Sequence, residues 1–309
     1  MKIIDSPRKY RDFINSSSRM DNVVFKGLRL DSRNFSKVVT DKGGGFHNVT
    51  FIKCRIGVSS ESSSNSDMRA FVEGYVEFNE CIIDNLKIDL SCYYAKELST
   101  IKIKGCKISN DLLIGRGVGQ VYIIGSNINN ILAYHKVESP FYIIDSHIKG
   151  YIQFSSNVPL KIGSNSLNFQ NSTIPILDFL SRNTSFSKIS KDSPVLNSFK
   201  SCGEVCVRNI SIEECDMSYF YANNWKMEGS LAVWDSNVEE FNLMDSTLYS
   251  SDYDIFSFLV YDSCVGKDSM EFPGKEHSVK EEGGSFFESS DTFVRYIVRI
   301  HGGEIIWSY

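Results

Sequence analysis

The chain has 309 residues, of which 42% are hydrophobic and 23% charged, and its formal net charge is -5. This slightly acidic balance argues against nucleic-acid binding through phosphates, which needs clustered Lys and Arg. No apolar run approaches the roughly 20 residues that cross a bilayer, so no membrane partner is expected. The opening MKIIDSPRKYRDF places charges where a secretory signal needs an apolar core. We therefore expect a cytoplasmic protein with reduced thiols.

Residues 1–22 predict a cap at the first end of the fold. Ser6 suits the N-cap of a helix that has Pro7 at its first position. Tyr10 and Phe13 would then share one face of this helix. A cap is expected because a stack of β-strands leaves unpaired backbone groups at each end.

One pattern recurs over residues 23–265: an apolar residue, two variable residues, a small residue, one variable residue and a second apolar residue. The copies are FIKCRI, FNECII, IKGCKI, IIGSNI, IIDSHI, FQNSTI, IEECDM, VWDSNV, LMDSTL and VYDSCV. The small position falls at Cys54, Cys81, Cys106, Ser126, Ser146, Ser172, Cys215, Ser236, Ser246 and Ser263. Several neighbouring copies lie 20 to 27 residues apart, and their short, β-branched and aromatic segments are typical of strands.

Such a period predicts a β-solenoid, in which each coil stacks on the previous one about 4.8 Å away. The apolar frame repeats because equivalent side chains form columns in the core. The small position repeats because a column at a tight corner selects small residues. The polar positions vary because they face solvent.

Two segments, FNECIIDNLKI (78–88) and FNLMDSTLYSS (241–251), carry a resemblance to pentapeptide-repeat proteins and the looser right-handed β-helices related to them. The resemblance covers roughly residues 23–265 and implies an all-β, single-stranded right-handed parallel β-helix with terminal caps. The strict five-residue period is absent, so an irregular three-faced helix fits as well as a regular four-sided one. Irregular helices of this kind also occur in bacterial effectors. The resemblance therefore implies an effector, immunity or defence setting, with delivery into a host cell by a non-classical route as one alternative.

Residues 266–309 predict a polar excursion followed by the second cap. The last part, 292–309, favours two strands joined at Gly302 and Gly303, with a helix as the alternative that its β-branched residues disfavour. Residues 180–201 interrupt the repeat, and we expect them to form a lateral protrusion.

Acidic residues precede the small position in several copies, which raises the hypothesis of an acidic stripe. Asp145 and His147, two residues apart in one strand, would project the same way. A polysaccharide hydrolase of the β-helix type would need two carboxylates about 5–10 Å apart in a groove. Corner residues that hydrogen-bond the backbone are the favoured interpretation, because these acids recur with the repeat. Asp145 and His147 stay the catalytic candidates of the alternative hypothesis, a polysaccharide lyase or hydrolase.

The cysteines predict no metal site. CGEVC (202–206), followed by Cys215, lacks the tighter Cys pairs and the nearby His that structural zinc uses. Cys215 already occupies the small position of a copy, where packing explains it. We expect neither a metal nor another cofactor.

The favoured function is a non-enzymatic scaffold that binds another protein through a flat side of the solenoid, with residues 180–201 as a second contact. Tyr219, Tyr221 and Trp225 are the binding candidates, since aromatic residues are frequent at interfaces. A partner-binding role predicts an exposed aromatic patch without converging titratable groups. A second copy of the chain on an open coil end is a further alternative.

Overall fold

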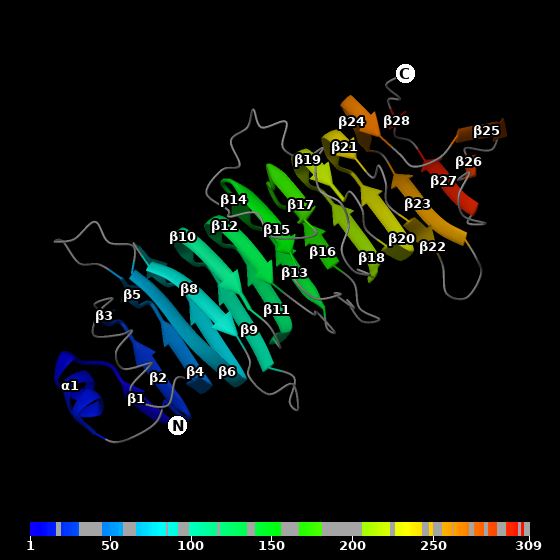
Figure 1. Ribbon diagram of the computed structural model, residues 1–309. Helices are drawn as coiled ribbons and strands as arrows, with labels where there is room; N and C mark the ends of the chain where they lie inside the picture. Colours follow the sequence, from blue (N-terminus) through cyan, green and yellow to red (C-terminus); the bar gives the residue numbers. More distant parts are fainter. Residues whose placement is uncertain are drawn as a thin grey trace.

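The computed structural model describes most of the repeat region and parts of both ends. The described residues are 1–16, 20–30, 45–57, 66–84, 86–91, 99–115, 118–134, 140–155, 167–180, 206–222, 226–242, 247–249, 255–261, 263–271, 275–280, 284–288, 295–301 and 304–305. Almost all of them belong to short strands that follow one another along an elongated stack, with the two termini at opposite ends (Figure 1). The predicted protrusion at 180–201 lies almost wholly outside the described residues, and only the end of a strand reaches it.

One face of the stack, the first sheet, takes one strand from each coil, and neighbouring strands are parallel. Its strands pair in the order β1 (Lys2–Ile4), β2 (Val23–Lys26), β4 (Gly45–Ile52), β6 (Ser66–Asn79), β9 (Ser99–Lys104), β11 (Val118–Ile124), β13 (Phe141–Ile144), β16 (Leu167–Gln170), β18 (Cys206–Glu213), β20 (Lys226–Trp234), β23 (Ile255–Tyr261) and β27 (Arg295–His301).

The second sheet takes the strands that follow the corner of each coil, and these are also parallel to their partners. They are β3 (Arg29–Leu30), β5 (Arg55–Ile56), β7 (Ile82–Ile83), β8 (Leu86–Ser91), β10 (Lys107–Ile114), β12 (Asn127–Tyr134), β14 (His147–Ile148), β15 (Tyr151–Ser155), β17 (Ile176–Leu180), β19 (Asp216–Tyr221), β21 (Asn237–Asn242), β24 (Cys264–Glu271) and β28 (Glu304–Ile305). The short β22 (Thr247–Tyr249) pairs with the start of β20. The prediction of an all-β chain with long parallel sheets is confirmed, and the arrangement is consistent with a parallel β-solenoid.

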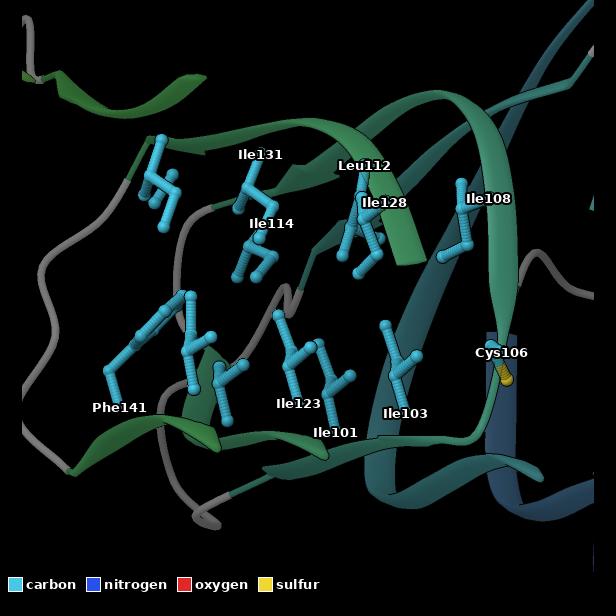
Figure 2. Close-up of a cluster of buried hydrophobic side chains, with 14 of the residues drawn as sticks. Ile101, Ile103, Cys106, Ile108, Leu112, Ile114, Ile123, Ile128, Ile131 and Phe141 are labelled. Atoms are coloured by element: carbon cyan, nitrogen blue, oxygen red, sulfur yellow. The ribbon is translucent and has the colours of Figure 1, made fainter. Parts of the chain in front are cut away.

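The apolar residues of the repeat form columns between the two sheets. Phe25, Phe51 and Phe78 occupy equivalent positions in successive coils, and their rings stack at centroid distances of 5.1 and 4.8 Å. The same register continues through Ile103, Ile123 and on along the first sheet. Figure 2 shows isoleucines of the two sheets pointing toward one another across the interior. Strands β9, β13 and β16 thus bury every second side chain, which is why the apolar frame repeats.

A helix lies at the first end of the stack, as the sequence predicted. Helix α1 (Pro7–Asn15) begins after Ser6, whose side chain accepts a hydrogen bond from the Lys9 N–H at 3.3 Å. Tyr10 and Phe13 are buried, and their rings meet Phe25 edge-on at 6.2 and 5.7 Å. The helix therefore packs on the first phenylalanine of the core column. Figure 1 shows the helix at the end of the stack where the chain begins.

The other end differs from the expected arrangement. Two strands do form on either side of Gly302 and Gly303, which lie outside the described residues, but each pairs with the preceding coil. Strand β27 runs parallel to β23, and β28 runs parallel to β24. The parallel ladder thus continues beyond Val265 to Ile305. The edge of β27 is paired by an antiparallel hairpin of β25 (Lys275–Lys280) and β26 (Gly284–Glu288), which keeps that edge from recruiting another chain.

Candidate functional site along the corner

The corner between the two sheets repeats a left-handed backbone conformation in successive coils. The residue before the small position has a positive φ, for example 57° at Gly125, 51° at Asp145 and 43° at Asn171. Gly, Asn and Asp reach this region at the lowest cost. The corner interpretation of the acidic residues is therefore supported, but the predicted reason was incomplete. Asp145 accepts a hydrogen bond at 2.7 Å from the side-chain amide of Asn171 in the next coil, so the acid joins coils through side chains.

The small position is held by a ladder of hydrogen bonds. Ser146 Oγ accepts from the Ser126 N–H of the preceding coil at 3.1 Å and donates to the Ile144 carbonyl at 2.8 Å. Ser126 Oγ likewise accepts from the Cys106 N–H, and Ser172 Oγ accepts from the Ser146 N–H. The sequence prediction explained the small position by its volume alone and did not include this hydrogen-bonding requirement. The signal was present in the sequence, because the ten copies use Ser and Cys and never Ala or Gly.

The thiols of Cys54, Cys81, Cys106 and Cys215 in this column are buried. Cys81 Sγ donates to a backbone carbonyl of the preceding coil, and its own N–H donates to Cys106 Sγ at 3.4 Å. The contact with Cys106 raises the pKa of Cys81 to about 12. A thiol with a pKa well above its ordinary range stays protonated, so Cys81 serves packing and hydrogen bonding rather than nucleophilic chemistry.

Replacement of Ser146 tests the ladder. Ser146→Ala should lower the free energy of unfolding by about 1–3 kcal/mol, because the buried Ser126 N–H loses its acceptor. Ser146→Cys should lose less, since sulfur accepts the equivalent bond at Cys106. Urea unfolding of the two variants measures the difference. Equal losses would mean that the small position is selected by volume alone.

An open groove of about 520 Å³ follows this corner over successive coils. The groove is open at Gly125, where a Cβ atom added to the glycine would find no other atom within 4 Å. Both catalytic candidates, Asp145 and His147, line the groove. They do not share one strand as predicted, because β13 ends at Ile144 and β14 begins at His147, so the two residues flank the corner. The other polar residues that line it are Glu80, Lys107, Ser126, Asn127, Ser146, Asn171 and Thr173.

The spacing of the groove carboxylates decides what chemistry it offers. Glu80 and Asp145 are its two acidic residues, and the coils of Gly105 and Gly125 lie between them. Three coil steps place their backbones about 14 Å apart, at about 4.8 Å for each step. A glycoside hydrolase needs about 5–9.5 Å between its carboxyl groups. Glu80 and Asp145 therefore do not form the carboxylate pair that a glycoside hydrolase needs.

An aromatic strip lies beside the groove on the first sheet. Tyr122 and Tyr142 stack with their ring centroids 5.1 Å apart and an interplanar angle of 7°. They alternate with the buried Ile123, so they face away from the core, and both are half-buried. Ile124 and Ile144 follow them in the same strands and lead directly into the corner. We call the groove together with Tyr122, Tyr142, Ile124 and Ile144 the corner surface.

The predicted binding residues lie elsewhere. Tyr219 and Tyr221 stack at 5.6 Å on the outer side of β19 in the second sheet, while Trp225 lies outside the described residues. Tyr221 Oη donates to Glu240 Oε2 at 2.8 Å. Burial, together with this hydrogen bond, raises the pKa of Tyr221. The structure thus places the predicted aromatic candidates and the predicted catalytic candidates on different faces.

A buried acidic residue that the sequence did not reveal lies next to these tyrosines. Asp178 is 4% exposed and Gln153 is fully buried, and Gln153 Nε2 donates to Asp178 Oδ2 at 3.2 Å. Both point away from the tube, because their neighbours Ile152 and Leu177 belong to the core. Burial raises the pKa of Asp178 to about 7. Strand alternation predicts that such residues are exposed, so their burial has no signal in the sequence.

This raised pKa predicts a dependence of stability on pH. Asp178 binds its proton more tightly in the folded state than in the unfolded state. The stability that this proton contributes is therefore complete below the ordinary pKa of 3.8 and is lost as pH rises to about 7. Asp178→Asn mimics the protonated acid and should therefore gain stability over the wild type across this window. The gain should be on the order of 4 kcal/mol above pH 7. Thermal unfolding at acidic and alkaline pH measures it, and a constant difference between the two proteins would contradict the assignment.

In the described part of the chain, no three His, Cys, Asp or Glu side chains are placed to hold a metal ion. The same residues contain no helix that is long and apolar enough to span a membrane. Cys215 donates to the Glu213 carbonyl at 3.2 Å, and Cys202 lies outside the described residues. No protein-family model, curated protein or solved structure matches the chain.

Proposed function

We propose that this protein is a non-enzymatic scaffold that binds another protein along the corner surface. The observation that carries the proposal is the stacked Tyr122–Tyr142 pair beside a polar groove that runs along the stack. Tyrosines supply contact area with few rotatable bonds, and the groove supplies hydrogen-bonding groups at each coil. The combination suits a partner segment that lies parallel to the stack.

The backbone of the corner supports this role. In each coil, the N–H of the left-handed residue donates to the next coil, as Gly125 does to the Ile144 carbonyl at 2.9 Å. The buried side-chain ladder of Ser126 and Ser146 reinforces it. A surface held in this way is already ordered before the partner arrives, so little conformational entropy is lost on binding.

The biological setting is inferred from the resemblance to pentapeptide-repeat proteins. A right-handed β-helix that resembles pentapeptide-repeat proteins suggests a bacterial effector, immunity or defence protein, and we include this setting in the proposal. A polysaccharide lyase or hydrolase is the second candidate, since Asp145 and His147 line one groove. The separation of Asp145 from Glu80 favours binding over hydrolysis.

Affinity capture with matched variants tests the proposal. The tagged wild type should retain a stoichiometric protein partner from its native lysate, and Tyr122→Ser/Tyr142→Ser should lose that partner. Tyr219→Ser/Tyr221→Ser, which removes a stacked tyrosine pair from the other sheet, should retain it. Each variant must first show an unfolding transition like that of the wild type. Retention of the same partner by the Tyr122/Tyr142 variant would overturn the proposal. A polysaccharide-cleavage screen, with Asp145→Asn as control, would test the second candidate.

A further inference from the structure

The outer side of the second sheet contains buried acceptors without matching donors. Gln153 Oε1 is buried and has no hydrogen-bond partner among the described residues. Asp178 receives one hydrogen bond, from the amide of the same Gln153. A carboxylate and an amide oxygen both accept hydrogen bonds, and buried acceptors in folded proteins are normally satisfied. Within the described part of the chain, this pair therefore lacks a donor, and a bound group would supply one.

The strands around this pair carry negative charge and no basic residue. Strands β15, β17, β19 and β21 contain no Lys, Arg or His, whereas they contribute four acidic residues. These are Asp178, Asp216, Glu239 and Glu240. A buried carboxylate is normally paired with a cation, and here the neighbouring strands provide none.

Aromatic rings lie beside the unmatched acceptors. The register pairs Gln153 with Asp178 and Asp178 with Tyr221, so the three side chains follow one another at about 4.8 Å intervals. Tyr219 stacks on Tyr221, and Glu240 accepts the Tyr221 hydroxyl proton in a hydrogen bond. Aromatic faces attract cations, and they favour organic ammonium groups over strongly hydrated metal ions.

We propose that Gln153, Asp178, Tyr221 and Glu240 form a binding site for a protonated primary amine. The ammonium group brings three donors and one positive charge, which match the amide oxygen, the free carboxylate oxygen and the negative surroundings. The hydrocarbon chain of the amine would lie against the tyrosine rings. This site is separate from the corner surface and does not depend on the proposed scaffold function.

Two sources can supply the same chemistry, a free amine or the lysine side chain of a bound peptide. Isothermal titration calorimetry with n-butylammonium and with a short lysine-containing peptide distinguishes them by which one binds more tightly. Sodium chloride at equal ionic strength controls for screening. We expect saturable binding to the wild type that weakens at least about tenfold in Asp178→Asn, which is about 1.4 kcal/mol. Glu213→Gln, on an exposed position of β18, should bind like the wild type.

Release of a proton from Asp178 on ligand binding is a second readout, which is not expected if Asp178 has only a structural role. Because Asp178 is protonated below about pH 7, binding of the cation near pH 6 should release close to one proton. Near pH 8.5, where the carboxylate is already charged, the release should vanish. Titrations in buffers with different ionisation enthalpies measure it. Absence of saturable binding by both ligands, equal affinity in Asp178→Asn, or no proton release near pH 6 would each overturn the proposal.

Discussion

Ile143→Asp is expected to unfold the coil that contains it and to lower the free energy of unfolding by at least about 4 kcal/mol. Ile143 is fully buried, and in the first sheet it lies in register between Ile123 and Phe169. A carboxylate at this position would have no partner, and two neighbouring coils would lose their contact with the column. Chemical denaturation followed by circular dichroism measures the loss.

Lys149→Asp is the matched control for this substitution. Lys149 is exposed and lies between two strands of the second sheet, so the same new charge is solvated there. We expect the unfolding free energy of this variant to stay within about 0.5 kcal/mol of the wild type. Equal stability of the Ile143 and Lys149 variants would contradict the assignment of the apolar repeat to the core.

Phe51→Ala should cost about 3–5 kcal/mol, because it removes the middle ring of a stacked column. Phe51 is fully buried, with Phe25 on one side at 5.1 Å and Phe78 on the other at 4.8 Å. The cavity that the substitution leaves is bounded by hydrogen-bonded strands on adjacent coils, so the rings of Phe25 and Phe78 cannot close it. Urea unfolding gives the cost.

Trp234→Ala provides the comparison, since it removes a larger aromatic side chain that is 39% exposed. Its loss of stability should be clearly smaller than that of Phe51→Ala, because part of the side chain already contacts water. If both substitutions destabilised the protein equally, the phenylalanine column would not be the feature that holds the first coils together.

The core could be predicted from the sequence because each coil repeats the same apolar spacing. Ile123 and Ile143 occupy equivalent places in their copies and prove to be neighbours in the first sheet. The last coil was missed although Ile300 and Ile305 keep the spacing of the repeat. Its Gly302–Gly303 pair indicated a tight hairpin turn, and only the pairing of β27 and β28 with the preceding coil shows otherwise.

The candidate sites could be predicted only in part. Asp145 and His147 line one groove, although they flank a corner and do not share the strand that their spacing indicated. The groove itself depends on Gly105 and Gly125 occupying the same corner in stacked coils, which no single copy reveals. The burial of Asp178 follows from what surrounds the outer side of its strand, which strand alternation does not determine.

Pulsed electron–electron double resonance between genetically encoded spin labels tests the coil stack on which both proposed sites depend. Lys53, Asp145 and Glu214 occupy the same corner position in different coils. Four coil steps separate Lys53 from Asp145 and six separate Lys53 from Glu214, so the backbone separations should be about 19 and 29 Å. Distances that increase in this proportion would support one continuous parallel stack. A Lys53–Glu214 distance no longer than the Lys53–Asp145 distance would contradict it.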